Sequence, residues 1–374
     1  MKQFKSGQYI SQGYYKSFQP EFINRQLQID DMKILQLLSQ ADRELGRLDM
    51  YSKFIPNIDL FISMHVLKEA TQSSKIEGTQ TNMDEALLDK ADLPLNKRDD
   101  WEEVQNYIKA MELAIEHLDK LPFSSRLIRE THRILLQGVR GEKKQPGKFR
   151  ISQNWIGGAT INDAVFIPPV HSFVPELMSD IEKFIHNEEF HIPEMLKIGL
   201  VHYQFETIHP FLDGNGRVGR LMIPLYLVSK GILRKPVLYL SDFFEKNRKL
   251  YFDNLTAVRE KNDLGQWYKF FLVGMIETAK NGIITFDNIL QLQKQIDNDI
   301  QSLGSRAIKA KKVIGYLYKR PMITADKVSE IASVSMPSSY KLISDLEKLN
   351  VLKEKTGGQR SRVYSFDNYL KLFR

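Results

Sequence analysis

The sequence predicts a mainly α-helical protein that carries a small β-hairpin and a separate C-terminal domain. Apolar residues recur at three- and four-residue steps along most of the chain, which is the period of amphipathic helices. Residues 154–169 combine a turn with a β-favouring run. Residues 306–374 have the pattern of three helices followed by a hairpin, and the 374-residue chain is long enough for two or three domains.

The composition limits the classes of protein and of site. Hydrophobic residues make up 42% and charged residues 26% of the chain, as in soluble globular proteins. There is no cysteine, so disulfides and thiolate–zinc sites are excluded. No run of about eighteen apolar residues occurs and residues 1–5 lack a signal-peptide core, so we expect a cytoplasmic location. The absence of a Walker-type lysine loop and of a Rossmann glycine pattern disfavours an ordinary nucleoside triphosphatase or dehydrogenase.

The N-terminal region, residues 1–100, is expected to be helical. Its clearest helix covers about residues 59–78, because no proline or glycine interrupts the run that begins at Asp59. Gly78 then provides a C-terminal stop, since glycine readily adopts the left-handed conformation that ends helices. Residues 101–290 are assigned to a helical core.

Two helices of this core enclose a polar loop. Residues 194–208 place apolar side chains on one face, and Pro210 ends this helix because the residue before a proline avoids the helical region. His209 is therefore expected at the helix exit. Residues 217–230 form the second helix, and the glycine-flanked turn at residues 214–216 leads directly into it. Free backbone amides and the helix dipole favour an anion at that point.

The loop contains the side chains that phosphate chemistry requires. Asp213 is a hard oxygen ligand suited to Mg²⁺ that is bound to phosphate oxygens. Arg217 and Arg220 lie three residues apart, on one side of the first helical turn, and can bind phosphate oxygens. His209 has an ordinary pKa suited to accepting a proton from a hydroxyl. Together these groups indicate attack of a hydroxyl on the phosphate of a nucleotide.

From His209 to Arg220 the sequence is His-Pro-Phe-Leu-Asp-Gly-Asn-Gly-Arg-Val-Gly-Arg. This segment resembles the signature of the Fic family at every fixed position. Most Fic proteins transfer AMP from ATP to a hydroxyl side chain of a target protein and release pyrophosphate. The resemblance implies a protein adenylyltransferase that uses ATP and Mg²⁺ and modifies a Ser, Thr or Tyr of a target protein or of itself. A Doc-type kinase is disfavoured, because in that branch a lysine replaces the second glycine region.

The same resemblance implies roles for individual residues. His209 would be the general base, Asp213 would hold Mg²⁺, and Arg220 would bind the γ-phosphate. The implied nucleotide-binding residues of the loop are Asp213, Gly214, Asn215, Gly216, Arg217, Val218, Gly219 and Arg220.

A second segment, Ser73-Ser-Lys-Ile-Glu-Gly78, resembles the inhibitory motif of Fic proteins, which is a Ser or Thr, three residues and then Glu-Gly. We refer to residues 73–78 as the inhibitory segment; Ser73 and Glu77 are its motif residues. Glu77 would pair with Arg220 and so occupy the arginine that the γ-phosphate needs. In related proteins the same glutamate can support removal of AMP, which stays open as a second activity. Taken alone, the pattern also fits an ordinary exposed glutamate at a helix end.

Two further segments are candidates for the site. Residues 154–169 are expected to form a hairpin, which in Fic proteins is a flap that aligns a target strand, although it could equally shield the core. The residues expected at the tip of this flap are Thr160, Ile161, Asn162 and Asp163. Asn247 and Tyr251 lie four apart on a predicted helix, and the resemblance implies that Tyr251 packs against adenine while Asn247 bonds to the nucleotide. Core packing of an aromatic pair at helical spacing is the alternative.

Residues 291–305 are expected to link the core to a basic C-terminal domain. Residues 306–374 contain fifteen Lys and Arg against six Asp and Glu, a balance of +9, whereas the whole chain is +7. Three helices and a hairpin resemble a winged helix-turn-helix, whose third helix enters the major groove in DNA-binding members. DNA is therefore a candidate partner; protein docking or a homodimer contact is the alternative. The candidate DNA contacts are Ser338, Ser339, Tyr340 and Lys341 for bases and Lys355, Arg360 and Arg362 for phosphates.

Two other functions remain open on the sequence alone. One is a DNA-binding regulator whose nucleotide pocket acts as a sensor. The other is a Fic transferase with a different donor, such as UTP, GTP or a nucleotide-choline, because selection of adenine depends on a pocket shape that the sequence does not give.

Overall fold

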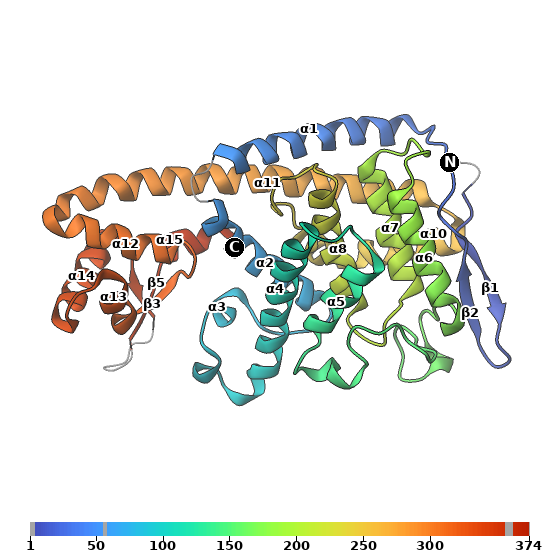
Figure 1. Cartoon of the computed structure of the whole chain (residues 1–374), viewed down its shortest axis with the longest axis horizontal. Helices are drawn as coiled ribbons and strands as arrows, with labels where there is room; N and C mark the ends of the chain where they lie inside the picture. Colours follow the sequence, from blue (N-terminus) through green and yellow to red (C-terminus); the bar gives the residue numbers. More distant parts are fainter. Residues whose placement is uncertain (1–3, 55–57, 356–361, 374) are drawn as a thin grey trace.

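Two long helices lie side by side along one edge of the molecule (Figure 1): α1 (Met32–Phe54) and α11 (Leu264–Asp299). The Nζ of Lys269 on α11 lies 2.6 Å from Asp31 Oδ2, just before α1. At 1.5 Å per residue, the 36 residues of α11 span roughly 54 Å, so this helix joins the two ends of the molecule. The structure is a computed structural model that describes residues 4–54, 58–355 and 362–373.

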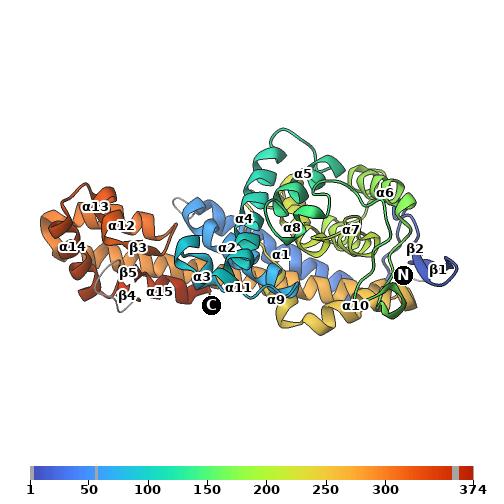
Figure 2. The ribbon, with the colours of Figure 1, turned by 90° about the horizontal axis from the view of Figure 1, so that it is seen from below.

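α7 (Glu194–Ile208) packs against α11 and lies at the end of the molecule away from the C-terminal elements, as Figure 2 shows from below. Every side chain of α7 from Met195 to Ile208 is buried, and α8 (Asn215–Ser229) packs directly against it. The predicted mainly helical fold class is confirmed, and the helices expected at 59–78, 194–208 and 217–230 are present within two residues of those limits. The remaining core helices are α2 (Ile58–Ile76), α3 (Met83–Ala86), α4 (Arg98–Leu118), α5 (Ser125–Leu135), α6 (Val174–His186), α9 (Ser241–Lys246) and α10 (Arg248–Lys261).

Short 3₁₀ helices connect these elements. In the described ranges, no helix is long and apolar enough to cross a membrane. The 3₁₀ helices are η1 (Lys90–Asp92), η2 (Leu95–Lys97), η3 (Arg140–Lys143), η4 (Ile161–Asp163), η5 (His171–Phe173), η6 (Ile300–Arg306) and η7 (Lys371–Phe373).

The N-terminal region is not wholly helical, because it begins with an antiparallel hairpin of β1 (Gly7–Ser11) and β2 (Lys16–Pro20). The Phe18 side chain is fully buried, and its backbone N–H donates to Ile167 O at 2.9 Å. The alternation of buried and exposed side chains along these strands is weak, since Tyr9 is 47% exposed. The expectation of a helical region was therefore wrong for these residues. The hairpin supports the segment that was expected to form the flap.

The C-terminal residues form the three predicted helices and the predicted pair of strands, with one extra strand before the second helix. The sheet order is β3-β5-β4, all antiparallel. The assignment to a winged helix-turn-helix and DNA binding by this part of the chain both stay predictions. The elements are α12 (Ala307–Leu317), β3 (Met322–Thr324), α13 (Ala325–Ala332), α14 (Met336–Lys348), β4 (Lys353–Glu354), β5 (Val363–Ser365) and α15 (Asp367–Leu370).

The candidate DNA-contact residues are not all on the surface. Tyr340 is 53% exposed, but Ser339 is fully buried and its hydroxyl donates to Met336 O at 2.8 Å, so Ser339 was wrongly placed on a reading face. Ser338 and Lys341 are exposed. Lys355 Nζ pairs with an oxygen of Asp367 at 2.9 Å, and Arg362 Nη1 lies 3.8 Å from Glu354 Oε2. Arg360 lies outside the described residues.

The segment expected as a linker is helical. Residues 291–299 are the last turns of α11, and residues 300–306 form η6, in which Gly304 has non-helical angles of φ 57° and ψ −124°. Apolar side chains of this segment, such as Ile296 and Ile300, are buried. That residues 291–305 link two separate domains stays a prediction.

Candidate active site

His209 lies at the C-terminus of α7 in a left-handed conformation, with φ 50° and ψ 60°. This conformation is uncommon for a residue other than glycine and has to be held by its surroundings. The buried guanidinium of Arg150 does so: its Nε donates to His209 O at 3.0 Å and its Nη2 donates to the carbonyls of Ile208 and Pro169. A cation among the last carbonyls of a helix also complements the helix dipole. Arg150 therefore fixes the backbone conformation of His209 at the end of α7.

Burial lowers the pKa of His209 to about 4, with smaller effects from Glu77, which raises it, and Arg150, which lowers it. The imidazole is consequently neutral near pH 7 and can accept a proton. Among the described residues its Nδ1 atom is buried without a hydrogen-bond partner. A neutral, incompletely paired imidazole at this position fits the role of a base.

The turn between α7 and α8 is fixed by the side chain of Asn215. Its Oδ1 accepts from Phe211 N at 2.8 Å and its Nδ2 donates to Phe211 O at 2.9 Å, so Asn215 fixes the shape of the loop. Asn215 itself is buried. Gly214 has φ 74°, which the turn requires. Asp213 Oδ1 accepts from Gly214 N at 2.6 Å, while the Asp213 carboxylate stays 41% exposed. The α8 N-terminus thus presents backbone amides next to an accessible carboxylate.

The side chains of the first turns of α8 diverge. Val218 and Gly219 are buried against the core, so any contact of theirs with a nucleotide would come from the backbone. Arg217 turns toward α4, where its Nη1 lies 3.1 Å from Glu103 Oε2, and its Nη2 lies 3.6 Å from Asp213 Oδ1. Arg220 turns toward α2 instead. The two arginines lie three residues apart near the start of α8, as expected, but each pairs with a carboxylate from a different part of the chain.

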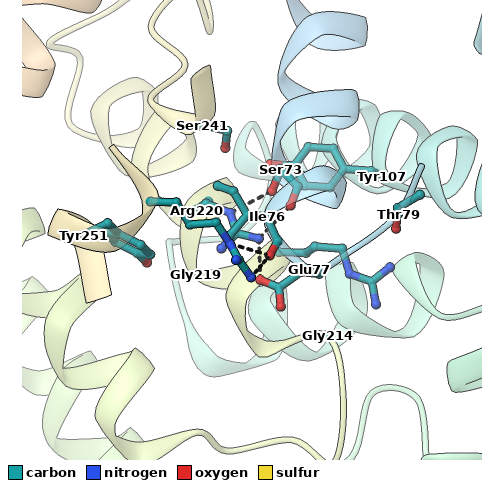
Figure 3. Close-up of polar contacts among 12 residues, drawn as sticks. Ser73, Ile76, Glu77, Thr79, Tyr107, Gly214, Gly219, Arg220, Ser241 and Tyr251 are labelled. Carbon is teal, nitrogen blue, oxygen red and sulfur yellow. Dashed lines mark hydrogen bonds and ion pairs between the residues drawn. The ribbon is translucent and has the colours of Figure 1, made fainter. Parts of the chain in front are cut away.

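Figure 3 shows Arg220 directed at the end of α2. Its Nη2 donates to Glu77 Oε1 at 2.7 Å and to Ser73 O at 2.9 Å, and its Nε donates to Ser73 Oγ at 2.9 Å. Burial alone would raise the pKa of Glu77, but the Arg220 guanidinium outweighs it and leaves that pKa below its usual value. A Cβ added to Gly216 would lie 2.2 Å from Glu77 Oε1, so the carboxylate sits directly on the first turn of α8. The structure therefore brings the inhibitory segment onto residues 209–220, the loop that is expected to bind phosphate and is called the phosphate-binding loop below.

Hydrogen bonds from neighbouring elements hold α2 in this position. The buried carboxyl of Glu69 accepts from Tyr107 Oη at 3.0 Å and from Ser241 N and Oγ at 3.1 and 2.5 Å. Arg248 donates to Ile76 O at 3.0 Å, close to the end of the helix. Burial raises the pKa of Glu69, while the hydrogen bonds from Ser241 and Tyr107 act in the opposite direction.

The Fic/DOC family N-terminal model matches residues 35–116, and the Fic/DOC family model matches residues 122–227; together they cover about half of the chain. The chain belongs to the Fic/DOC family. Curated relatives named protein adenylyltransferase Fic, from Drosophila erecta, and probable protein adenylyltransferase, from Aquifex aeolicus, are 31% and 37% identical to it over 134 and 118 residues. These matches cover 34% and 32% of this chain but only 25% and 32% of the relatives, so the chain spans about a quarter to a third of their length.

Solved structures show the same fold over most of the chain. A Fic family protein from Desulfovibrio desulfuricans aligns with a TM-score of 0.59 at 18% identity, covering 91% of this chain and 98% of that one. A Fic domain containing signaling protein from Bacteroides thetaiotaomicron aligns with a TM-score of 0.52 at 19% identity over 67% of this chain and 95% of that one. At these identities the likeness concerns the fold.

Two residues that support the Fic loop were not found from the sequence. His132 on α5 accepts from Gly147 N at 2.8 Å through Nδ1, so its Nε2 carries the proton that bonds to Asp213 O at 2.9 Å. Its ring stacks on Phe211 with centroids 3.7 Å apart, and burial lowers its pKa to about 4. Glu103 on α4 binds Arg217, as described above. Neither residue belongs to a recognisable motif, so no local pattern in the sequence could have indicated them.

The expected flap of the Fic fold is less regular than a hairpin. Only Ile156 and Phe166 pair as an antiparallel bridge, because Gly157 and Gly158 at φ 71° and 74° break the strand. The tip is the short helix η4, closed by Asp163, whose Oδ1 accepts from Thr160 N at 2.7 Å. At this tip Ile161 is half-buried, and the exposed side chains are those of Thr160, Asn162 and Asp163. Docking of a target protein on the flap stays a prediction.

Tyr251 belongs to the core of the Fic domain. It is 1% exposed, its Oη bonds to His202 Nε2 at 2.8 Å, and its ring stacks on Phe244 with centroids 4.5 Å apart. This arrangement matches core packing, and the structure does not place the ring on an open nucleotide surface. Asn247 is half-buried between α9 and α10, with its Nδ2 donating to Phe243 O at 3.0 Å, and its contact with a nucleotide stays a prediction.

Glu206, one turn before His209, is a buried carboxyl that the sequence did not single out. A Cβ added to Gly219 would lie 2.2 Å from its Oε1, and within the described part of the chain this atom has no hydrogen-bond partner. Burial raises the pKa of Glu206 to about 7, opposed by Arg220 and reinforced by Glu77. The folded state therefore binds the Glu206 proton more tightly than the unfolded state does.

We expect Glu206→Gln to stabilise the protein more in alkaline than in acidic solution. A raised carboxyl pKa contributes stability that is complete below the unfolded pKa near 4.5 and is lost as pH rises through about 7. The melting temperature of the variant should exceed that of wild type by on the order of 2 °C or more at pH 8 and by less at pH 5. Exposed Glu189→Gln is the control, and equal shifts at both pH values would contradict this account.

Proposed function

We propose that this protein is a Mg²⁺-dependent adenylyltransferase that transfers AMP from ATP to a Ser, Thr or Tyr hydroxyl of a target protein or of itself. The observation that supports this most is a neutral His209 next to the amides of the α8 N-terminus, with Asp213 accessible in the same loop. The names of the curated relatives from Drosophila erecta and Aquifex aeolicus agree with this chemistry.

In the proposed reaction, neutral His209 accepts the proton of the target hydroxyl. The hydroxyl oxygen attacks the α-phosphorus of ATP, a new P–O bond forms, and the bond to the β-phosphate oxygen breaks, so that pyrophosphate leaves. Backbone amides of the first turn of α8, starting at Asn215, stabilise the negative charge that develops on the phosphate oxygens. Arg150 keeps His209 in its left-handed conformation throughout.

Asp213 fits a Mg²⁺ ion that is shared with a nucleotide. Its carboxylate is 41% exposed, and the described residues contain no group of three or more His, Asp or Glu that could hold a metal by themselves. Mg²⁺ commonly binds to one or two carboxylates together with substrate phosphates, so Asp213 and the phosphate oxygens are the expected donors. The ion would neutralise charge on the phosphates.

The inhibitory segment is proposed to limit this activity. Glu77 and Ser73 take up three hydrogen bonds of Arg220, the side chain that the γ-phosphate needs, and Glu77 places a negative charge on the first turn of α8. Because the Glu77 carboxylate is 39% exposed, a nucleotide can reach and displace it. The same carboxylate, facing an AMP-modified residue, is also suited to assist removal of AMP, which we keep as a second activity.

Two labels on ATP test the reaction class. With wild-type protein and Mg²⁺, label in the α-phosphate should enter protein and label in the γ-phosphate should not, because pyrophosphate leaves. Incorporation of the γ-label instead would identify a phosphotransferase and contradict the proposal. Competition by unlabelled UTP and GTP reports the donor, and mass spectrometry locates the modified residue. ATP-responsive DNA binding without incorporation of either label would favour the sensor function.

A further inference from the structure

One buried carboxylate, that of Glu103 on α4, receives hydrogen bonds from three other parts of the chain. Arg140 Nε on η3 donates to its Oε1 at 2.7 Å, and Arg217 Nη1 on α8 donates to its Oε2 at 3.1 Å. The Thr79 hydroxyl donates to the same Oε2 at 3.0 Å. Glu103 is 3% exposed, and its bonds with Thr79 and Arg217 are buried, whereas the Arg140 side chain is 60% exposed.

Arg217 depends on this carboxylate. The Arg217 side chain is 5% exposed, and its other carboxylate neighbour, Asp213, is farther away at 3.6 Å and 41% exposed. A buried guanidinium needs an opposite charge nearby, and a charge-assisted hydrogen bond also fixes the orientation of the planar guanidinium group. Glu103 therefore sets the direction of the first arginine of the phosphate-binding loop.

Thr79 connects the same carboxylate to the inhibitory segment. It directly follows Gly78, is 1% exposed, and its N–H donates to Ser74 O at 3.1 Å. The next residue, Gln80, donates its N–H to Asp100 Oδ2 at 2.8 Å, one turn before Glu103 on α4. The chain that leaves α2 is thus bound to α4 at the point where α4 holds Arg217.

We propose that Glu103 is a positioning residue: it holds the Arg217 guanidinium beside Asp213, where the phosphates of ATP would bind, and, through the Thr79 hydroxyl, fixes the end of the inhibitory segment to the same point. This inference rests on the proposed nucleotide site. The phosphate-binding loop and the inhibitory segment are both bonded to the Glu103 carboxylate, so a change in the position of one alters the position of the other.

Isothermal titration with Mg²⁺–ATP tests the first half, and it requires no turnover. In the Glu77→Gly background, adding Glu103→Gln should raise the dissociation constant of Mg²⁺–ATP about tenfold or more, while the stoichiometry of binding stays near one. A variant that only misfolds would lower the stoichiometry instead of the affinity. The control is Glu102→Gln in the same background, since Glu102 pairs with Lys90 near the surface. If Glu103→Gln fails to fold, Glu103→Asp withdraws the carboxylate from Arg217 while keeping the charge.

Thr79→Val in the otherwise wild-type protein tests the second half. Loss of the hydroxyl should loosen the inhibitory segment and tighten Mg²⁺–ATP binding about threefold or more, whereas the same change in the Glu77→Gly background should have no effect. Thr71→Val is the control, because among the described residues the Thr71 hydroxyl bonds to carbonyls of its own helix. An unchanged dissociation constant in the Glu103→Gln experiment contradicts the role of Glu103 at Arg217. An unchanged constant for Thr79→Val in the otherwise wild-type protein contradicts its role at the inhibitory segment. Failure of AMP transfer alone would contradict the proposed reaction and leave both binding results standing.

Discussion

Replacing His209 by alanine is expected to lower the rate of AMP incorporation by about 10²- to 10⁴-fold, the usual contribution of a positioned general base. In the folded protein the imidazole is neutral because burial lowers its pKa to about 4, so wild type should also keep its base form down to about pH 5. Alanine removes the acceptor for the hydroxyl proton but leaves Asp213, the α8 amides and Arg220 in place. Binding of Mg²⁺–ATP should therefore change little.

The measurement is incorporation of α-labelled AMP by Glu77→Gly and by the double variant Glu77→Gly, His209→Ala. Exposed His171→Ala in the same background is the control, since it lies outside the loop. Incorporation by the His209 variant within about threefold of its parent would show that another group takes the proton. Loss of incorporation together with loss of nucleotide binding would instead point to a structural role for His209.

Replacing Glu77 by glycine should raise incorporation of AMP by about 10- to 100-fold. The change removes the 2.7 Å ion pair with Arg220 and the negative charge that sits against Gly216, both of which oppose a bound triphosphate. Hydrogen bonds to charged groups are worth about 1.5–3 kcal/mol, and each 1.4 kcal/mol is tenfold in an equilibrium. Ser73→Ala should have a smaller effect, because the backbone carbonyl of Ser73 still accepts from Arg220.

Glu112→Gln on the surface of α4 serves as the matched control for Glu77→Gly. Unchanged incorporation in Glu77→Gly would remove the inhibitory role of the segment, whatever the geometry of the ion pair. A rise in incorporation with no rise in nucleotide affinity would show that Glu77 acts on the orientation of bound ATP.

The sequence predicted the part of the site that is contiguous along the chain. His209, Asp213 and the α8 N-terminus lie within a few residues, so helix-end rules and glycine conformations place them without knowledge of the rest of the fold. The contact of Glu77 with Arg220 spans 143 residues and was expected only through the family resemblance. Without that resemblance, the local sequence also fits an exposed Glu77 at the end of a helix.

What the sequence missed depends on packing between distant elements. His132 and Glu103 approach the loop from α5 and α4, and their neighbours are 81 and 114 residues away. Tyr251 was proposed to face a nucleotide but is buried, because an aromatic residue at helical spacing looks the same in either role. Glu206 illustrates the same limit: its raised pKa follows from burial against Gly219, which no spacing rule reveals.

A crystal structure of Glu77→Gly with Mg²⁺ and ATP tests the central claim most directly. We expect a triphosphate bound at the N-terminus of α8, with the α-phosphate facing His209, Mg²⁺ on Asp213 and the γ-phosphate on Arg220. A structure at saturating Mg²⁺–ATP that shows no nucleotide at this turn, or one whose α-phosphate faces away from the imidazole, would contradict the account.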